Sequence, residues 1–234
     1  MGVGGMKRRS ILYVTGTDTG VGKTVLSVLL TRRLLSLGLD VWGLKPVVSG
    51  GREDARLLHG VQGGGVPLEV VNPWHFRAAL APPLAARRQG VRVELDAVVG
   101  HVRSCVVSGR ALIVEGAGGL LSPLGEGFDS RDLIRALRAI PVIVAANRLG
   151  AVHQVRAVLA GLPRWQRVRA VVVLSGEKKG AAAASNAALL LEFEPGLRLV
   201  ELPWVERWQG GGELGGAVGE ALDQVAKLAG WLGD

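Results

Sequence analysis

The feature that most constrains the fold is a glycine-rich loop at residues 16–24, which read GTDTGVGKT. An apolar run, Ser10–Thr15, precedes the loop, and a helical pattern of apolar residues begins at Val25. A strand, a tight turn and a helix start in this order form a phosphate-binding loop, where backbone N–H groups and the helix dipole face an anion. Lys23 supplies a positive charge for the terminal phosphates, and the Thr24 hydroxyl is placed to hold Mg²⁺. The sequence therefore predicts a nucleotide site at this loop.

One position departs from the strict pattern G-x-x-x-x-G-K-[ST]. The first glycine of that pattern falls at position 17, where this chain has Thr17, and Gly16 comes one residue early. A chance glycine-rich turn is the alternative interpretation. The apolar run before the loop and the helical pattern after it favour the nucleotide-binding loop.

The composition is that of an ordinary globular chain. Its 234 residues are 48% hydrophobic and 21% charged, and a chain of this length can bury a substantial core. We expect a single domain over residues 1–234, with a disordered extension at residues 1–8. The apolar runs are too short to span a membrane, and the basic N-terminus lacks the apolar segment of a signal peptide. Together with the single cysteine, Cys105, these features predict a cytoplasmic protein without a membrane partner.

The net charge of +8 raises the question of nucleic-acid binding. Beyond the N-terminus the densest basic stretches are pairs, as at Arg32-Arg33 and Arg87-Arg88. No ladder of aromatic residues and no RNA-binding signature accompanies them. Solvated helix faces and attraction for anionic metabolites explain the charge, so we expect no nucleic-acid partner.

Apolar runs alternate with helical patterns along the chain. Several runs are rich in Val, Ile and Leu without alternation, which is typical of parallel strands buried on both faces. The sequence therefore predicts an α/β fold: a doubly wound, mainly parallel sheet with helices on both faces, of the P-loop NTPase type. Gly38 is placed to end the first helix, and Pro82-Pro83 is expected to form an extended connection. The expected strands are Ile11–Thr15, Asp40–Lys45, Ala111–Glu115, Pro141–Ala146, Val168–Leu174 and Arg198–Leu202, and the expected helices are Lys23–Leu37, Leu95–Ser108, Ser130–Arg138, Val152–Ala160, Ala181–Leu191 and Leu214–Leu232.

Polar residues follow the predicted strands at the edge where such sheets bind ligands. Lys45 ends the second strand, and it either meets an anion or carboxylate there or reaches out to solvent. Asp54 is a candidate Mg²⁺ ligand or an acid that caps a helix. Glu115 ends the third strand within the sequence VEGAGG and matches a Walker-B-type metal ligand better than a turn cap. His153, near the helix start after the fourth strand, is expected to be structural and not a catalytic base.

Taken in order, six segments resemble those of dethiobiotin synthetases. They are YVTGTDTGVGKT at residues 13–24, GLKPVVSG at 43–50, VNPWHF at 71–76, VEGAGG at 114–119, RLG at 148–150 and ELPW at 201–204. The first, second and fourth are specific to this family in combination, and the six occur in order between residues 13 and 204, so the resemblance extends over most of the chain.

The resemblance implies a ligase that uses ATP and Mg²⁺ to close the ureido ring of dethiobiotin in biotin biosynthesis. The partners would be ATP, CO₂ or bicarbonate, and the vicinal diamine 7,8-diaminononanoate. One amine would form a carbamate, which would take the γ-phosphoryl group of ATP to give a carbamic–phosphoric anhydride. The second amine would then attack and release phosphate. Such an enzyme must align two anions, so positioning and charge neutralisation would carry the catalysis.

The resemblance also implies roles for individual residues. Lys45 and Lys23 would be catalytic, and Thr24, Asp54 and Glu115 would hold the metal. The substrate would contact Ser49, and its carboxylate would bind the loop of Leu149, Gly150, Ala151, Val152 and His153 across the interface of a homodimer. The nucleotide would contact Thr19, Gly20, Val21, Gly22, Lys23, Thr24, Val25, Asp54, Glu115, Gly116, Ala117, Gly118, Ser175, Gly176, Leu202, Pro203 and Trp204.

Two positions depart from the family pattern. After the fifth predicted strand the family usually has an asparagine that reads the adenine edge, whereas this chain has Ser175-Gly176. A hydroxyl makes fewer directed hydrogen bonds than an amide, so we expect a looser base preference. The family often has asparagine where this chain has His153, so carboxylate recognition would rest on backbone donors.

Two other functions remain as alternatives for a chain with such a loop. Another amide-forming synthetase of the same superfamily would usually carry a glutamine amidotransferase domain, for which this chain is short. A partition or positioning ATPase would carry a signature lysine early in the loop, where this chain has Asp18. Such ATPases often end in a basic helix that binds membranes, whereas the C-terminal segment of this chain, Leu214–Asp234, has one lysine and several acids.

Overall fold

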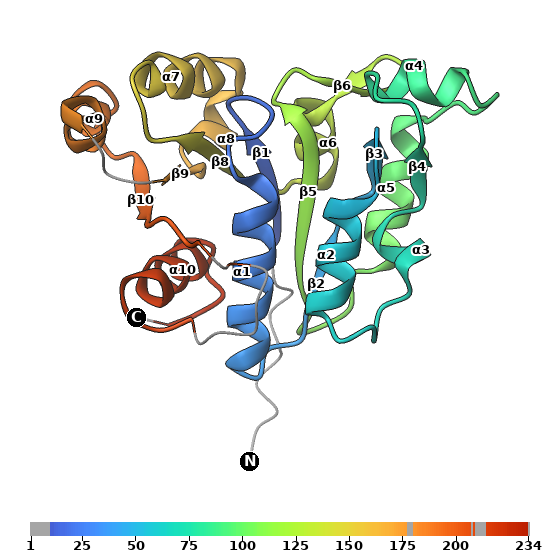
Figure 1. The fold of residues 1–234 in the computed structure, drawn as a ribbon, viewed down its shortest axis with the longest axis horizontal. Helices are drawn as coiled ribbons and strands as arrows, with labels where there is room; N and C mark the ends of the chain where they lie inside the picture. The colour runs from blue at the N-terminus through green and yellow to red at the C-terminus, as the bar shows by residue number, and fades with distance from the viewer. Residues whose placement is uncertain (1–9, 177–179, 207, 209–213, 234) are drawn as a thin grey trace.

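A six-stranded sheet forms the centre of the molecule (Figure 1). The computed structural model describes residues 10–176, 180–206, 208 and 214–233, and the predicted extension at residues 1–8 lies outside them. The strand order is β10-β9-β8-β1-β5-β2, and every neighbouring pair is parallel. The predicted doubly wound parallel sheet is therefore confirmed. The strands are β1 (Ile11–Gly16), β2 (Val41–Leu44), β5 (Ala111–Gly119), β8 (Ile140–Ala146), β9 (Val171–Ser175) and β10 (Arg198–Leu202).

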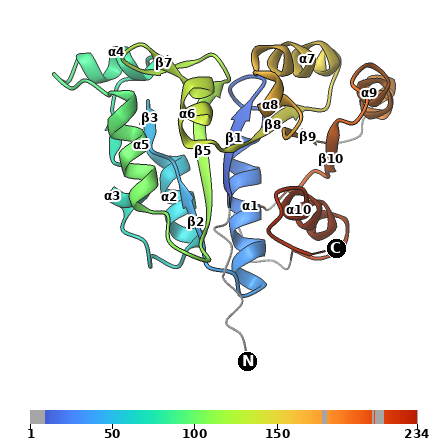
Figure 2. The ribbon, with the colours of Figure 1, turned by 180° about the vertical axis from the view of Figure 1, so that it is seen from behind.

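Helices cover both faces of this sheet, as opposite views show (Figures 1 and 2). Successive side chains of a strand point to opposite faces. In β1, Leu12 and Val14 join one apolar cluster with residues of α1 (Lys23–Ser36) and α10 (Gly216–Leu228). Tyr13 joins the cluster on the other side. That second cluster includes residues from α5 (Leu95–Ser104), α6 (Ser130–Leu137), α7 (Ala151–Gly161) and α9 (Gly180–Phe193).

Local sequence determines where several helices begin and end. α1 ends at Ser36, and Gly38 follows with φ of 76°, a left-handed conformation that glycine adopts without strain. This confirms the predicted end of the first helix. α6 begins with a capping box, in which Asp129 accepts a hydrogen bond from the Asp132 N–H and the Asp132 carboxylate accepts one from the Asp129 N–H.

Between β2 and β5 the chain builds several short elements that the sequence analysis did not predict. They include a small parallel pair of strands, β3 and β4. The predicted extended connection at Pro82-Pro83 is wrong, because these prolines begin a helix. Proline suits a first helical turn, since its φ is already fixed and its missing N–H has no partner to lose there. The elements are β3 (Val47–Ser49), α2 (Glu53–Val61), α3 (Leu68–Val71), β4 (Trp74–Phe76) and α4 (Pro82–Arg87).

Several predicted boundaries also differ from the structure. The strand expected from Val168 starts at Val171, because the short helix α8 (Arg164–Arg167) comes first. The helix expected to reach Ser108 ends at Ser104, and Cys105 lies buried at its C-cap. β6 (Pro123–Gly125) and β7 (Phe128–Asp129) form a small antiparallel pair that was not predicted. Among the described residues, no helix combines the length and the hydropathy needed to cross a bilayer.

Candidate active site

The glycine-rich loop joins β1 to α1 at the carboxyl edge of the sheet. A Cβ on Gly16 would stand 2.8 Å from a methyl group of Val21 and 2.9 Å from the carbonyl oxygen of Asp18, so glycine is required there for space. Gly20 and Gly22 have φ of 74° and 99°, which favour glycine by conformation. Thr17 replaces the strict first glycine, and its N–H donates to the Val144 carbonyl of β8 at 2.9 Å. The loop therefore keeps a phosphate-binding conformation although its first glycine is shifted.

Lys23 begins α1 and folds back over the loop. Its Nζ donates to the carbonyl oxygen of Asp18 at 2.8 Å, and the residue is 7% exposed. Burial lowers the pKa of Lys23, and the nearby positive charge of Lys45 lowers it further. The charged forms of the two lysines therefore repel each other. An anion bound near both, such as a polyphosphate, would stabilise their charged forms.

Lys45 lies directly after β2, and its ammonium group meets two carboxylates. Nζ stands 2.7 Å from Glu115 Oε1 and 3.3 Å from Asp54 Oδ2, and it also donates to the Gly116 carbonyl oxygen at 2.8 Å. The Thr24 hydroxyl donates to the same Glu115 Oε1 at 2.8 Å. Four elements or their ends, α1, β2, α2 and β5, thus bring the predicted metal ligands and a predicted catalytic lysine together.

The electrostatics of this cluster keep Lys45 charged. Burial by itself disfavours the ammonium form, but the carboxylates of Glu115 and Asp54 outweigh burial and raise the pKa of Lys45. Glu115 is 1% exposed, and its second oxygen, Oε2, is buried without a hydrogen-bond partner. A buried carboxylate oxygen without a partner is costly, and a cation would satisfy it.

The donor set of Thr24, Asp54 and Glu115 fits Mg²⁺ rather than a transition metal. Mg²⁺ prefers oxygen ligands and usually keeps several waters, so one hydroxyl and two carboxylates suffice beside a phosphate. Within the described part of the chain, no group of three or more His, Cys, Asp and Glu side chains could hold a metal ion by itself. Mg²⁺ bound to Thr24, Asp54 and Glu115 would keep coordination positions for phosphate oxygens and water.

A cavity of about 840 Å³ opens beside this cluster. Lys23, Lys45 and Ser49 all line it, which places the two lysines at a single cavity. The Ser49 hydroxyl donates to the Leu80 carbonyl oxygen at 2.6 Å and so holds the segment before α4 against the cavity. The predicted residues that line the cavity are Thr19, Gly20, Gly22, Lys23, Thr24, Val25, Lys45, Ser49, Asp54, Ala117 and Gly118. Glu115 and Gly116 lie just behind Lys45.

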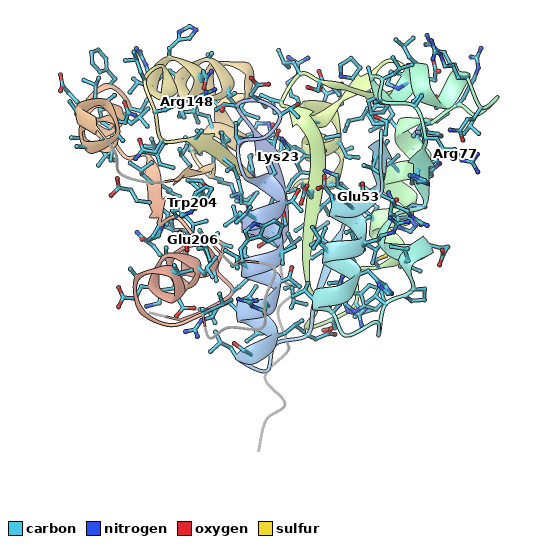
Figure 3. The ribbon with its side chains drawn as sticks, viewed as in Figure 1. Lys23, Glu53, Arg77, Arg148, Trp204 and Glu206 are labelled. Carbon is cyan, nitrogen blue, oxygen red and sulfur yellow. The ribbon has the colours of Figure 1, made fainter. Side chains whose placement is uncertain are left out.

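A second cavity of about 440 Å³ adjoins the other side of the loop. Trp204 is 59% exposed at its rim, and Ser175 Oγ lies 3.0 Å from where a Cβ of Gly22 would stand. Figure 3 shows Trp204 on the same side of Lys23 as Arg148, and Glu53 on the opposite side. The predicted residues that line this second cavity are Gly20, Val21, Gly22, Val25, Ser175, Gly176, Leu202, Pro203 and Trp204.

The predicted substrate loop, residues 149–153, lines neither of these two cavities. It forms the start of α7, where Gly150 has φ of 91°. Leu149 is 87% exposed, and His153 is also exposed. The first N–H groups of a helix have no intrahelical acceptor, so the start of α7 offers backbone donors to solvent or to a ligand.

Several cavity residues were not found from the sequence. Asn147 and Trp208 line the second cavity, and residues 79–82 line the first. The polar Asn147 directly after a buried strand was the one signal available. Its amide is held in place, because Nδ2 donates to the Ala183 carbonyl oxygen at 3.1 Å and Oδ1 accepts from Asn186 at 2.9 Å.

Comparison with known proteins first defines the class. The family model described as an AAA domain matches residues 10–210. Among solved structures, a plasmid partition protein of Borrelia burgdorferi B31 bound to AMPPNP has a TM-score of 0.57 at 12% identity, covering 95% of this chain and 98% of that chain. The MinC:MinD cell division complex of Aquifex aeolicus has a TM-score of 0.57 at 16% identity, with 94% and 96% covered. Identities this low show the fold alone, and that fold is the P-loop NTPase fold.

Curated relatives then narrow the class to one family. The ATP-dependent dethiobiotin synthetase of Anaeromyxobacter dehalogenans (strain 2CP-C) is 39% identical over 199 residues, which are 82% of this chain and 89% of the relative. The enzyme of the same name from Xylella fastidiosa (strain Temecula1) is 37% identical over 155 residues, 63% of this chain and 69% of the relative. The chain belongs to the ATP-dependent dethiobiotin synthetase family and is an ATP-dependent ligase.

Proposed function

We propose that this chain forms dethiobiotin from 7,8-diaminononanoate, CO₂ and ATP, with Mg²⁺, as a step of biotin biosynthesis. The observation that carries the proposal is the cluster of Lys23, Lys45, Asp54 and Glu115 beside the 840 Å³ cavity. Family membership supports the overall reaction. The geometry supports a site whose lysines can neutralise a triphosphate and whose cavity can also hold a small substrate near Ser49.

The reaction balances without a redox step. One amine of the substrate adds to CO₂ and loses a proton, which gives a carbamate. A carbamate oxygen attacks the γ-phosphorus of ATP, so that ADP leaves and a carbamic–phosphoric anhydride forms. The second amine then attacks the carbonyl carbon, the ring closes, and phosphate leaves with its electron pair while the amine loses a proton.

Lys45 is the residue best placed for the transferring phosphoryl group. Its ammonium is buried, stays charged, and is held between the two carboxylates within reach of the cavity. Lys23 and the loop N–H groups serve the polyphosphate at the same time. Fixed positive charge aimed at charge that develops in the transition state is the largest single source of catalysis in many enzymes. Thr24, Asp54 and Glu115 would hold Mg²⁺, which supplies further positive charge to phosphate oxygens when bound.

We propose further that the substrate carboxylate binds the start of α7, residues 149–153, from a second copy of the chain in a homodimer. The exposed apolar Leu149 and the backbone donors of this helix start support the proposal. Gly150, Val152 and His153 would supply N–H groups, whereas the Ala151 N–H already donates to the Arg148 carbonyl oxygen at 3.1 Å. Ala151 would line the site, and the His153 side chain would not act as a base. A cytoplasmic location stays a prediction.

The test is formation of dethiobiotin by the purified protein. The mixture contains the diamine, bicarbonate, ATP and Mg²⁺, and each component is left out in turn. We expect equal amounts of dethiobiotin, ADP and phosphate, with ATP turnover that requires the diamine. ATP turnover that ignores the diamine and is instead stimulated by DNA or lipid vesicles would contradict the proposal and favour a partition or positioning ATPase.

A further inference from the structure

The side chain of Arg52 spans the gap between α2 and the chain before β4. Arg52 is the N-cap residue of α2, two positions before Asp54. Its Nε donates to Asn72 Oδ1 at 3.0 Å, and its Nη2 donates to the Asn72 carbonyl oxygen at 2.9 Å and to the Leu68 carbonyl oxygen at 3.3 Å. The side chain is 18% exposed, so these hydrogen bonds hold the guanidinium in a largely buried position.

Asn72 in turn contacts the backbone of Lys45. It is fully buried, and its Nδ2 donates to the Lys45 carbonyl oxygen at 2.6 Å and to the Pro46 carbonyl oxygen at 3.3 Å. On the other side, the Lys45 N–H donates to the Val71 carbonyl oxygen at 2.8 Å. The backbone of Lys45 is therefore held at both its N–H and its carbonyl by residues 71–72.

These contacts close a ring around the candidate metal site. The path runs from Asp54 to Arg52 along α2, from Arg52 to Asn72, and from Asn72 to the backbone of Lys45. The Lys45 side chain then returns to Asp54, with Nζ 3.3 Å from Oδ2. Neither Arg52 nor Asn72 lines the cavity, so neither is placed to touch substrate or nucleotide.

We propose that Arg52 and Asn72 are positioning residues that fix Asp54 relative to Lys45, and we call the pair the Arg52–Asn72 brace. The inference rests on the proposed function only for the roles of Lys45 and Asp54. Without the brace, the first turn of α2 could move relative to the end of β2, because Asp54 is itself 42% exposed and weakly held. Displacing a metal ligand or a phosphate-binding cation by a fraction of an ångström is costly in catalysis.

The guanidinium of Arg52 and the amide of Asn72 each have the hydrogen-bonding groups that the Arg52–Asn72 brace requires. The brace needs a planar fork that donates in two directions, which a guanidinium provides and an ammonium group does not. It also needs a side chain that accepts from Arg52 while donating to Lys45, which an amide provides and a carboxylate does not. The ion pair of Arg52 with Glu69 is 3.7 Å long and Glu69 is 78% exposed, so that pair contributes little.

The experiment compares Arg52→Met and Arg52→Lys with Arg56→Met as a matched control. Arg56 lies one turn further along α2, is 63% exposed, and forms an ion pair with Glu53. For Arg52→Met we expect kcat for dethiobiotin formation to fall about tenfold or more, with the KM for ATP within about twofold of wild type. Arg52→Lys should behave like Arg52→Met, because it keeps the charge but loses the fork.

A second measurement does not depend on turnover. The Mg²⁺ concentration that gives half-maximal binding of a fluorescent ATP analogue should rise about tenfold in Arg52→Met and stay unchanged in Arg56→Met. Combining Arg52→Met with Asn72→Leu should cost no more than about twofold beyond the larger single effect, because the two residues act as one unit.

Several outcomes would overturn the brace. They are wild-type kcat and Mg²⁺ response in a folded Arg52→Met protein, full activity in Arg52→Lys, or equal loss of ATP binding and turnover that follows a fall in Tm. If the wild type makes no dethiobiotin, the proposed function fails. In that case the Mg²⁺ concentration for half-maximal nucleotide binding, compared between Arg52→Met and Arg56→Met, still shows whether the Arg52–Asn72 brace positions the metal site.

Discussion

Lys45 is the side chain on which the charge balance of the site depends. It occupies the position between Glu115 and Asp54 that a divalent cation would share, and its ammonium is the positive charge that both carboxylates meet in the structure. A bound metal and triphosphate would redistribute these contacts. Lys45 would then be free to turn from the carboxylates towards the transferring phosphoryl group.

Replacing Lys45 tests this role. Lys45→Gln should cost on the order of 3 kcal/mol or more of transition-state stabilisation, the scale of losing one preorganised donor. Nucleotide binding should survive better than turnover, because Lys23 and the loop amides remain. Steady-state kinetics and nucleotide titration measure the two effects, with Lys227→Gln on the exposed side of α10 as the matched control. Near-normal turnover by Lys45→Gln would remove Lys45 from the mechanism.

The proposed metal ligands, Asp54 and Glu115, give a second prediction. Asp54→Asn should raise the Mg²⁺ requirement and lower turnover while the thermal melt stays nearly unchanged, because the Asp54 side chain is 42% exposed. Glu115→Gln should raise the Mg²⁺ requirement too, and also lower the melt, because it leaves buried Lys45 with a weaker counter-charge. Glu53→Gln, next to Asp54 and 74% exposed, is the control of equal charge. Loss of stability without any change in Mg²⁺ dependence would make both carboxylates structural.

The base of the nucleotide gives a third prediction at this scale. Ser175 packs against Gly22. The Asn147 amide is already engaged, because its Nδ2 donates to the Ala183 carbonyl oxygen and its Oδ1 accepts from Asn186. A pocket without a dedicated side-chain reader rejects wrong bases weakly. We expect CTP, GTP or UTP to support ring closure within about tenfold of ATP, a difference of roughly 1.4 kcal/mol. Turnover with each triphosphate at subsaturating concentration measures this, and strict dependence on ATP would show that backbone groups near Gly176 or Trp204 read the adenine.

At the scale of elements, the helices and strands that the sequence predicted well are those with a continuous local signal. β1, the loop and α1 follow from a strand, a glycine-rich turn and a helical pattern in direct succession, and Glu115 follows from the buried run before it. The short elements between β2 and α5 were missed. They are only three to nine residues long, and their apolar positions pack on distant parts of the chain.

The same reason explains which site contacts were missed. The Arg52–Asn72 contact joins residues 20 positions apart, and nothing in their sequence spacing indicates that they meet. The Pro82-Pro83 prediction failed because two prolines suit the first turn of a helix as well as an extended segment. Local patterns therefore predicted the loop and the carboxylates of the candidate metal site, whereas the residues that support the site could be found only from the fold.

α9 offers a prediction about helix packing and pH. Directly after α9, the Glu194 carboxylate accepts from Arg156 of α7 at 3.0 Å and from Arg167 of α8. Partial burial opposes ionisation, but the two arginines outweigh it and lower the pKa of Glu194. A carboxyl whose pKa is lower in the folded state stabilises the protein above its unfolded pKa, and this contribution is lost as pH falls through the folded pKa.

Thermal melts between about pH 7 and pH 3 measure that contribution. At neutral pH the wild type should melt at a higher temperature than Glu194→Gln, and the difference should shrink as the pH falls below 4.5, the ordinary pKa of a glutamate side chain. Glu192→Gln, on the exposed side of α9, is the control. A difference between wild type and Glu194→Gln that is independent of pH would mean that Glu194 acts by packing and not by charge.

At the scale of the whole molecule, the site is distributed over the carboxyl edge of the sheet. β1 leads into the loop, Lys45 directly follows β2, β5 carries Glu115, and β8 leads to the start of α7 (Figure 1). The first three meet at one cavity. The start of α7 lines neither cavity, so its proposed contact with the substrate carboxylate requires a second chain to bring it there.

The last prediction therefore concerns oligomeric state. We expect a homodimer of two 24.5 kDa chains by light scattering, with the start of α7 at the interface. Leu149→Glu should shift the protein to monomer and raise the KM for the diamine, because a charge replaces an apolar side chain that is 87% exposed in one chain. Val168→Glu, also at an exposed apolar residue but beyond α8 at the opposite end of the strands, is the control. A monomeric wild type with normal turnover would place the whole substrate site within one chain.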